Sequence, residues 1–391
     1  MSSSLSSLPQ ELLIEIMIRL DSHSILQMAL TCRAFHRAFQ STPVRYIYEL
    51  GMNSLQDAGS GKSTDELLVL LRDRQKAWAT LEWKDFTTAE LPPSQPDFKQ
   101  SAGLLAKLDT SHSTIHLLVI YLPSPTQPSR TIRHSIDDMQ IYEFAIDGNQ
   151  DLLILGEYFK LPDKRYMRLH CCTISTNEVH PKATPGGILE FHIDENKYPQ
   201  YNLSMMQITL ADDVVAFSGY WREGRPQLLL WNWTSGLLLF NSFEDILPDR
   251  PPTLSFDFLR RDAFLLTSAI SSGQILVYRF SPTVPGMPVR VASLGLPPTV
   301  PPACVTYIRP NSGQFQPRST PEMLFMHLPE SRIHIFSIIC YLHRYMLLVR
   351  SSTFLRYVDD SASEARDVPW EMWGERESRF MEVDTVAADY M

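Results

Sequence analysis

The spacing of apolar residues changes near residue 100, and this change constrains the fold more than any other feature. Up to about residue 83, apolar residues recur every three or four positions, which is the period of a helix with one buried face. From about residue 100, short runs rich in β-branched and aromatic residues alternate with turns of Gly, Pro, Asn and Asp. A chain of 391 residues also exceeds the size at which one hydrophobic core usually stops growing. The sequence therefore predicts a multidomain protein, with all-α helices first and a mainly β domain after them.

The N-terminal region predicts four helices. The first has Pro9 in its first turn, where the missing N–H costs nothing, and the second covers residues 24–39 because Pro43 prevents its extension. A third, short helix covers residues 46–50, and a fourth covers residues 65–83. The expected inner face of the fourth helix consists of Leu67, Leu71, Trp78 and Leu81. We expect this helix to join the two domains.

The β region contains a repeated layout. In residues 151–176, 212–236 and 261–283, an aspartate precedes an apolar strand, a polar turn follows, and a second strand carries aromatic residues. The aspartates are roughly 50 to 60 residues apart, which is near the length of one four-stranded propeller blade. A weaker fourth copy covers residues 323–338, and the Pro-rich residues 281–321 before it are expected to form an exposed loop. The β domain is thus predicted to be a β-propeller.

A motif lies within the first 40 residues. The segment LSSLPQELLIEIMIRLDSHSILQMALTCRAFHRAFQ contains Leu-Pro, an acidic and apolar helix, and Cys-Arg followed by an aromatic residue two positions later. In order, spacing and chain position, this segment resembles an F-box. The alternative is a two-helix hairpin whose apolar face packs only on the rest of this protein.

The resemblance to an F-box implies a helical hairpin that fills a groove of a Skp-type adaptor with apolar side chains, and that reaches a cullin through this adaptor. The residues that it assigns to adaptor binding are Leu8, Pro9, Leu12, Leu13, Ile16, Leu20, Ile25, Leu26, Ala29, Cys32, Arg33 and Phe35.

Later stretches extend the resemblance over most of the chain. RQKAWATLEW, YEFAIDGNQDLLIL, LLLWNWTSG and DVPWEMWGERESR resemble a group of fungal F-box proteins with a propeller-like C-terminal half. Members of that group often continue further beyond the Trp-Gly motif, so the closure of the last blade is open. The resemblance divides the chain into an F-box helical domain (1–50), a helical linker (51–100) and a β-propeller-like domain (101–391) that is expected to bind a substrate protein.

The net charge, the longest apolar stretch and the cysteine content limit the classes of partner and the compartments that the sequence predicts. A formal charge of -9 and a pI near 5.7 disfavour attraction to nucleic acid or to an anionic membrane surface. The longest apolar stretch, residues 333–349, contains two histidines and an arginine and is too short to span a bilayer. Five cysteines without paired short spacings suit a reducing compartment. We therefore expect no nucleic acid partner, no membrane partner, and a cytoplasmic and/or nuclear location.

Residues 59–64 read GSGKST and end like a phosphate-binding loop, in which backbone N–H groups surround phosphates and lysine reaches the terminal ones. The full motif needs glycine where this sequence has Gln56, and we expect no apolar strand before the loop. A linker in which Ser63, Thr64 or Asp65 caps the next helix fits the residues better. Nucleotide binding through Lys62 is the remote alternative.

The other candidate sites favour structural roles. Residues 170–172 read His-Cys-Cys, but neighbours on a strand point to opposite faces and no second ligand group has a zinc-like spacing. Trp231 and Trp233 share one strand face and are expected to fill the core, although with Trp221 they are also candidates for a recognition surface. No nucleophile elbow such as Gly-x-Ser-x-Gly is present. We predict no catalytic residue, no metal and no cofactor.

Three functions follow as hypotheses. The leading one is a non-enzymatic substrate-recognition subunit of a Skp-cullin-F-box type ubiquitin ligase, which holds the adaptor with its helices and a target protein with its β domain. The first alternative is a propeller scaffold whose F-box serves a complex unrelated to ubiquitin. The second is a nucleotide-dependent enzyme that uses Lys62.

Overall fold

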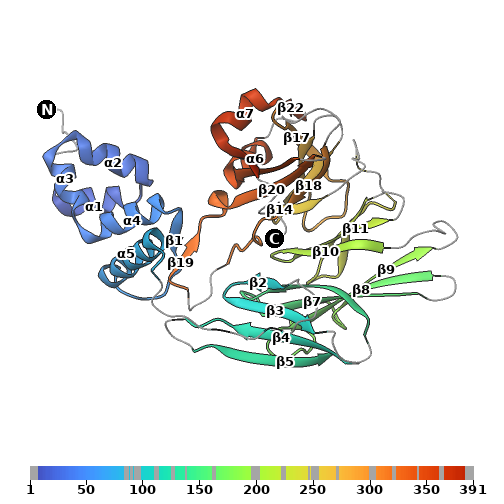
Figure 1. Cartoon of the computed structure of the whole chain (residues 1–391). Helices are drawn as coiled ribbons and strands as arrows, with labels where there is room; N and C mark the ends of the chain where they lie inside the picture. The colour runs from blue at the N-terminus through green and yellow to red at the C-terminus, as the bar shows by residue number, and fades with distance from the viewer. Residues whose placement is uncertain are drawn as a thin grey trace. The chain divides into compact units, whose positions relative to one another are not determined.

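The chain forms two compact units in the computed structural model (Figure 1). The helical unit comprises residues 1–90 and 318–331, and the propeller unit comprises residues 91–317 and 332–391. The structure describes residues 8–82, 88, 91, 98–109, 114–124, 128–136, 139–160, 164–194, 203–221, 226–244, 247, 255–269, 273–298, 305–318, 323–340, 343–360 and 365–383. None of the helices in these ranges is long and apolar enough to cross a membrane.

The helical unit begins with four helices. They are α1 (Gln10–Met17), α2 (Ser22–Thr31), α3 (Arg33–Phe39) and α4 (Thr42–Met52). The single helix predicted over residues 24–39 is wrong, because Cys32 adopts an extended backbone and divides it into α2 and α3. Pro43 lies in the first turn of α4, where its missing N–H leaves no hydrogen bond unmade.

The next helix, α5 (Thr64–Thr80), packs on α4 within the same unit. Leu67 and Leu71 are buried as predicted, and they share a cluster with Tyr46 and Leu50 of α4. The prediction for Trp78 and Leu81 is wrong, because both side chains are mostly exposed. The buried residues of α5 lie in its first two turns. Because α5 has 17 residues and α4 has 11, α4 is too short to cover the whole length of α5.

A two-stranded sheet completes the helical unit. The strand β1 (Leu55–Asp57) pairs antiparallel with β19 (Phe325–His327), and a short 3-10 helix, η2 (Pro329–Ser331), follows β19. The prediction of a propeller repeat at 323–338 is therefore wrong for the first apolar run, which pairs within the helical unit, whereas the second run lies in β20 (Ile333–Cys340) of the propeller unit. Sequence patterns could not distinguish the short strand β19 from a blade strand.

The propeller unit contains five mainly antiparallel sheets within the described residues, and each forms one blade. Blade 1 consists of β2 (Lys99–Ser101), β3 (Leu104–Asp109), β4 (Ile115–Tyr121) and β5 (Arg130–Ile136). Blade 2 consists of β6 (Ile141–Asp147), β7 (Leu152–Lys160), β8 (Lys164–Thr173) and β9 (Ile188–Asp194). Blade 3 consists of β10 (Leu203–Ala211), β11 (Val214–Trp221), β12 (Pro226–Asn232) and β13 (Leu237–Asn241).

The last two blades carry additional elements. Blade 4 consists of β14 (Phe256–Arg260), β15 (Ala263–Ser268), β16 (Gln274–Arg279) and β17 (Val289–Gly295), to which β22 (Arg366–Val368) adds in parallel. Blade 5 consists of β18 (Val305–Pro310), β20 (Ile333–Cys340), β21 (His343–Arg350) and β23 (Ser378–Val383). The helices α6 (Ser351–Asp359) and α7 (Trp370–Glu377) lie in sequence between β21 and β23. The chain therefore has helices followed by a five-bladed β-propeller, which confirms the predicted fold class.

The three predicted repeats form the second and third strands of blades 2, 3 and 4. Their apolar runs are continuous because central strands are buried on both faces. The prediction of an exposed loop over residues 281–321 is wrong, since this range contains β17 and β18 with buried residues such as Leu294 and Ile308. Blade 5 has four paired strands, with β23 as its outer strand.

Hydrophobic clusters join neighbouring blades. Separate buried clusters connect blades 1 and 2, 2 and 3, 3 and 4, and 4 and 5. Between blades 5 and 1, the Gln316 side-chain amide donates a hydrogen bond to Ser101 Oγ at 2.9 Å. Because the innermost strands come from all five blades, they surround one common centre.

Candidate functional site

The helices α1 to α4 form a small core. Asp21 caps α2, because its carboxylate accepts the backbone N–H of Ser24 at 2.9 Å. Met17, Ala38 and Val44 are fully buried between the helices. The helical hairpin therefore has an internal core of its own.

The predicted adaptor-binding residues fall into three groups by burial. Those in the core of the helical unit are Leu13, Ile25, Ala29 and Phe35. Those that are partly buried are Leu8, Ile16, Leu20 and Cys32, and those that are exposed are Pro9, Leu12, Leu26 and Arg33. Only the last two groups offer surface to a partner in this conformation.

Exposed leucines concentrate on the first two helices. Leu12 of α1 is 50% exposed, and Leu26 and Leu30 of α2 are 37% and 77% exposed. Leu26 and Leu30 are four residues apart, so they lie on one face of α2. Leu30 was missed by the sequence prediction, although its spacing from Leu26 could have identified it. An open groove of about 470 Å³ is lined by Ala29, Leu30, Cys32, Arg33, His36 and Arg37.

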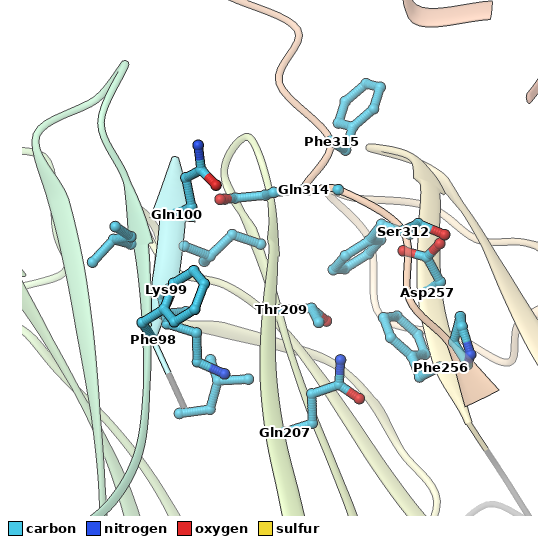
Figure 2. Close-up of a pocket in the computed structure, with 17 residues that line it drawn as sticks. Phe98, Lys99, Gln100, Gln207, Thr209, Phe256, Asp257, Ser312, Gln314 and Phe315 are labelled. Atoms are coloured by element: carbon cyan, nitrogen blue, oxygen red, sulfur yellow. The ribbon is translucent and has the colours of Figure 1, made fainter. Parts of the chain in front are cut away.

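The propeller has a pocket at its centre. Figure 2 shows its lining residues, which come from β2, β6, β10 and β14, from the end of β18 and from the segment that follows β18. The cavity volume is about 230 Å³. Polar side chains in the lining include Gln100, Gln207, Thr209, Ser312 and Gln314. Sequence reasoning missed this site because its residues are separated by more than 200 positions.

A Ser-His-Asp arrangement lies beside this pocket. His334 Nδ1 is 2.7 Å from Asp257 Oδ2, and its Nε2 is 2.9 Å from Ser351 Oγ. These distances match those of a catalytic triad. However, His334 and Ser351 are 0% exposed, so a substrate cannot reach the hydroxyl in this conformation.

The surroundings of Asp257 explain why it is charged. Burial alone would raise the pKa of Asp257, but Arg332 at 2.9 Å and His334 outweigh burial and lower it to about 2. Burial lowers the pKa of His334 despite this carboxylate. The pair is therefore a carboxylate beside a neutral imidazole at neutral pH, a network that links β14, β20 and α6.

The GSGKST loop follows β1, a strand of three residues with a single apolar side chain, Leu55, so no apolar strand precedes the loop, as expected. Among the described residues, that strand pairs only with β19, in an antiparallel sheet, which differs from the parallel sheet of phosphate-binding folds. Ser63 caps α5 as predicted, and the Glu66 carboxylate accepts the Ser63 backbone N–H at 3.2 Å. A carboxylate therefore occupies the helix N-terminus where a phosphate would bind, and Lys62 is exposed.

The remaining candidates have structural roles. Trp231 and Trp233 are buried in the core between blades 2 and 3, as predicted, and the Trp221 side chain lies outside the described residues. Burial raises the pKa of the Cys171 thiol to about 12, which disfavours the thiolate that a metal requires. Among the described residues, no three His, Cys, Asp or Glu side chains are grouped as metal ligands.

The fold and the sites define a two-part interaction protein, with a helical unit that exposes leucines and a β-propeller with a central pocket. Residues 5–44 match the family model described as F-box-like, and this segment covers α1, α2, α3 and the start of α4. The chain therefore carries an F-box-like domain, followed by a five-bladed β-propeller. This combination supports a role in protein interaction or substrate reception, and it is typical of non-enzymatic adaptor and receptor proteins.

The other comparisons add no relative. No curated protein matches the sequence. Among solved structures, the chain is similar to uncharacterized protein lmo1340 from Listeria monocytogenes EGD-e, with a TM-score of 0.33 and 9% identity over 77% of this chain and 83% of that chain.

Proposed function

We propose that this protein is the substrate-recognition subunit of a Skp-cullin-F-box type ubiquitin ligase. The F-box helices bind a Skp-type adaptor and, through it, a cullin, while the propeller binds a target protein. Ubiquitin transfer belongs to other subunits, so this chain acts by positioning the target. We place this protein in the cytoplasm and/or nucleus. We also assign it to the group of fungal F-box proteins with a propeller.

One observation carries the proposal. The segment that matches the F-box-like family, residues 5–44, is also the segment that exposes Leu12, Leu26 and Leu30. F-box domains typically bind Skp-type adaptors, and amphipathic helices bind grooves through such apolar residues. The propeller unit remains available for a second partner, because it has separate hydrophobic clusters of its own.

Two measurements test the proposal in sequence. The full chain is first titrated with a purified Skp-type adaptor, and saturable binding is expected. The chain is then assembled with adaptor and cullin, and its co-purified proteins are incubated with ubiquitin and the activating and conjugating enzymes. Ubiquitylation of a protein that depends on this chain supports a ligase subunit. Adaptor binding without such ubiquitylation supports the scaffold alternative instead, and absence of adaptor binding contradicts both.

A further inference from the structure

The central pocket of the propeller is too small for a whole ligand of drug size. Its volume of about 230 Å³ lies below the roughly 300 to 1,000 Å³ of typical small-molecule pockets. It is large enough for a few water molecules, each of about 30 Å³, or for one inserted side chain. The size therefore favours a single side chain that a larger partner presents.

The charges at this pocket are already compensated within the protein. Lys99 Nζ lies 2.7 Å from Glu143 Oε1, so its positive charge has a partner. The Asp257 carboxylate is paired with Arg332 at 2.9 Å. His334 adds no charge at neutral pH, because burial favours its neutral form. Among its described lining residues, the pocket thus offers no uncompensated cation to an acidic or phosphorylated ligand, and an unpaired buried anion is costly.

Several uncharged hydrogen-bonding groups of the pocket have no partner among the described residues. Within the described chain, the side-chain amides of Gln100, Gln207 and Gln314 make no hydrogen bond, although all three line the pocket (Figure 2). The Oγ1 atom of Thr209 is buried and has no partner among the described residues. Gln207 and Thr209 are two positions apart on β10, so they share one strand face. Each amide offers two donors and one acceptor, which suits a ligand that also donates and accepts.

Aromatic rings surround these amides. Phe256, Phe258 and Phe315 line the pocket and are themselves buried. They limit the access of water to the ligand, and hydrogen bonds are stronger where the local dielectric constant is low. A carboxamide with an apolar stem fits both the amides and the rings.

We propose that the central pocket binds the uncharged carboxamide side chain of a glutamine or asparagine in an extended segment of the target protein, and that it rejects the acidic or phosphorylated equivalent. The identification of the ligand as a target segment rests on the proposed function. The selectivity for an uncharged group rests on the pocket alone. Glutamine and glutamate have nearly the same shape, so the pair isolates the effect of charge.

The test uses peptide libraries as probes. Each library has random flanking residues and one fixed central residue, which is Gln, Asn, Glu or phosphoserine, and each is passed over the immobilised full chain. The Gln and Asn libraries should be retained at least about tenfold more than the Glu and phosphoserine libraries, because one charged or unsatisfied buried group costs about 1.4 kcal/mol or more. Equal retention, preference for the acidic libraries, or no retention of any library would overturn the proposal.

Substitutions at Gln207 locate the binding. Gln207→Leu keeps the approximate size and removes the amide, so retention of the Gln library should fall about tenfold. Gln207→Lys adds an uncompensated cation and should shift preference toward the Glu library. Gln140→Leu is the matched control, since Gln140 is exposed and does not line the pocket. Thermal unfolding of each variant verifies the fold, and unchanged selectivity in both Gln207 variants would place the peptide elsewhere.

Adaptor titration of the same samples separates the two proposals. If the adaptor binds but the libraries are not distinguished, the pocket inference is wrong and the receptor function stands. If the adaptor does not bind but the Gln library is retained, the receptor function is wrong and the pocket selectivity stands.

Discussion

Replacing the exposed leucines of the F-box with alanine should weaken adaptor binding without unfolding the protein. The variant carries Leu12→Ala, Leu26→Ala and Leu30→Ala together. Alanine is the best helix former, and all three positions are inside helices, so α1 and α2 should persist. The thermal unfolding temperature should therefore remain close to that of the unmodified chain.

The expected loss follows from the surface that each leucine still exposes. Full burial of a leucine side chain contributes about 2 kcal/mol of stabilisation. In proportion to its exposed fraction, the burial that remains available in a complex with the adaptor is worth about 1 kcal/mol at Leu12, about 0.7 kcal/mol at Leu26 and about 1.5 kcal/mol at Leu30. Alanine removes most of this contribution. A total loss of about 2 to 3 kcal/mol corresponds to an affinity that is weaker by roughly 30-fold to 140-fold.

Isothermal titration with a purified Skp-type adaptor measures this loss. The matched control is Met52→Ala with Val69→Ala, because both side chains are exposed in the same unit but lie outside residues 5–44. Ile25→Ala provides a contrast: Ile25 is 0% exposed, so its truncation should cost about 2 to 5 kcal/mol of stability in the helical unit itself. An unchanged affinity in the triple variant, or an equal loss in the control, would refute the assignment of the leucines as anchors.

Three further predictions concern the loop, the buried histidine and the extent of the helical unit. Lys62→Ala should change the free energy of unfolding by less than about 0.5 kcal/mol, because Lys62 is exposed. ATP or GTP should not raise the melting temperature of the unmodified chain or of this variant. A nucleotide-dependent rise that the substitution abolishes would restore the enzyme alternative. Because the pKa of His334 is lowered on folding, the unfolded chain takes up its proton first, and stability should fall below about pH 6.5 by up to about 1.4 kcal/mol per pH unit. Denaturant titrations between pH 7 and 5 measure how the free energy of unfolding changes with pH. This change should be smaller for His334→Gln than for the exposed control His343→Gln, and equal changes would contradict the assignment of the pH dependence to His334. A fragment of residues 1–82 should be more helical by circular dichroism, and bind the adaptor more tightly, than residues 1–50, because α5 covers Tyr46 and Leu50; an equally helical shorter fragment would argue against this dependence.

The F-box and the blade centres could be predicted because their signals are local. The F-box motif lies within 40 consecutive residues, and the family match over residues 5–44 falls on the same segment. The runs of β7, β11 and β15 are recognisable because central strands are apolar on both faces. The division of the helical hairpin into buried and exposed residues depends on how the helices pack, since Ile25 and Leu26 are adjacent in sequence but Ile25 is buried and Leu26 is exposed.

The remaining features depend on contacts between distant residues. The pairing of β1 with β19 joins positions 270 residues apart, as Leu55 lies opposite His327 and Asp57 opposite Phe325, and each strand has only three residues. The central pocket collects residues from the innermost strand regions of five blades, none of which is unusual in its own segment. A single Gln or Thr gives no signal of its own. Only closure of the ring brings Gln100, Gln207 and Gln314 around one cavity.

The buried network around Asp257 is better explained by chain connectivity than by catalysis. Residues 318–331 leave the propeller unit between β18 and β20 and return to it at Arg332. The Arg332 guanidinium donates to the Gly313 carbonyl oxygen at 2.7 Å and to Asp257, so it holds the residues before and after this insertion together. Closing such an insertion costs conformational entropy, and a fixed charge pair at its base offsets part of that cost. Loss of one partner would leave a buried charge uncompensated, which commonly costs about 3 to 5 kcal/mol. Asp257, His334 and Ser351, which lie at the distances of a catalytic triad, therefore have a structural reason to be buried. They keep blades 4 and 5 joined where the chain leaves the propeller unit to supply β19.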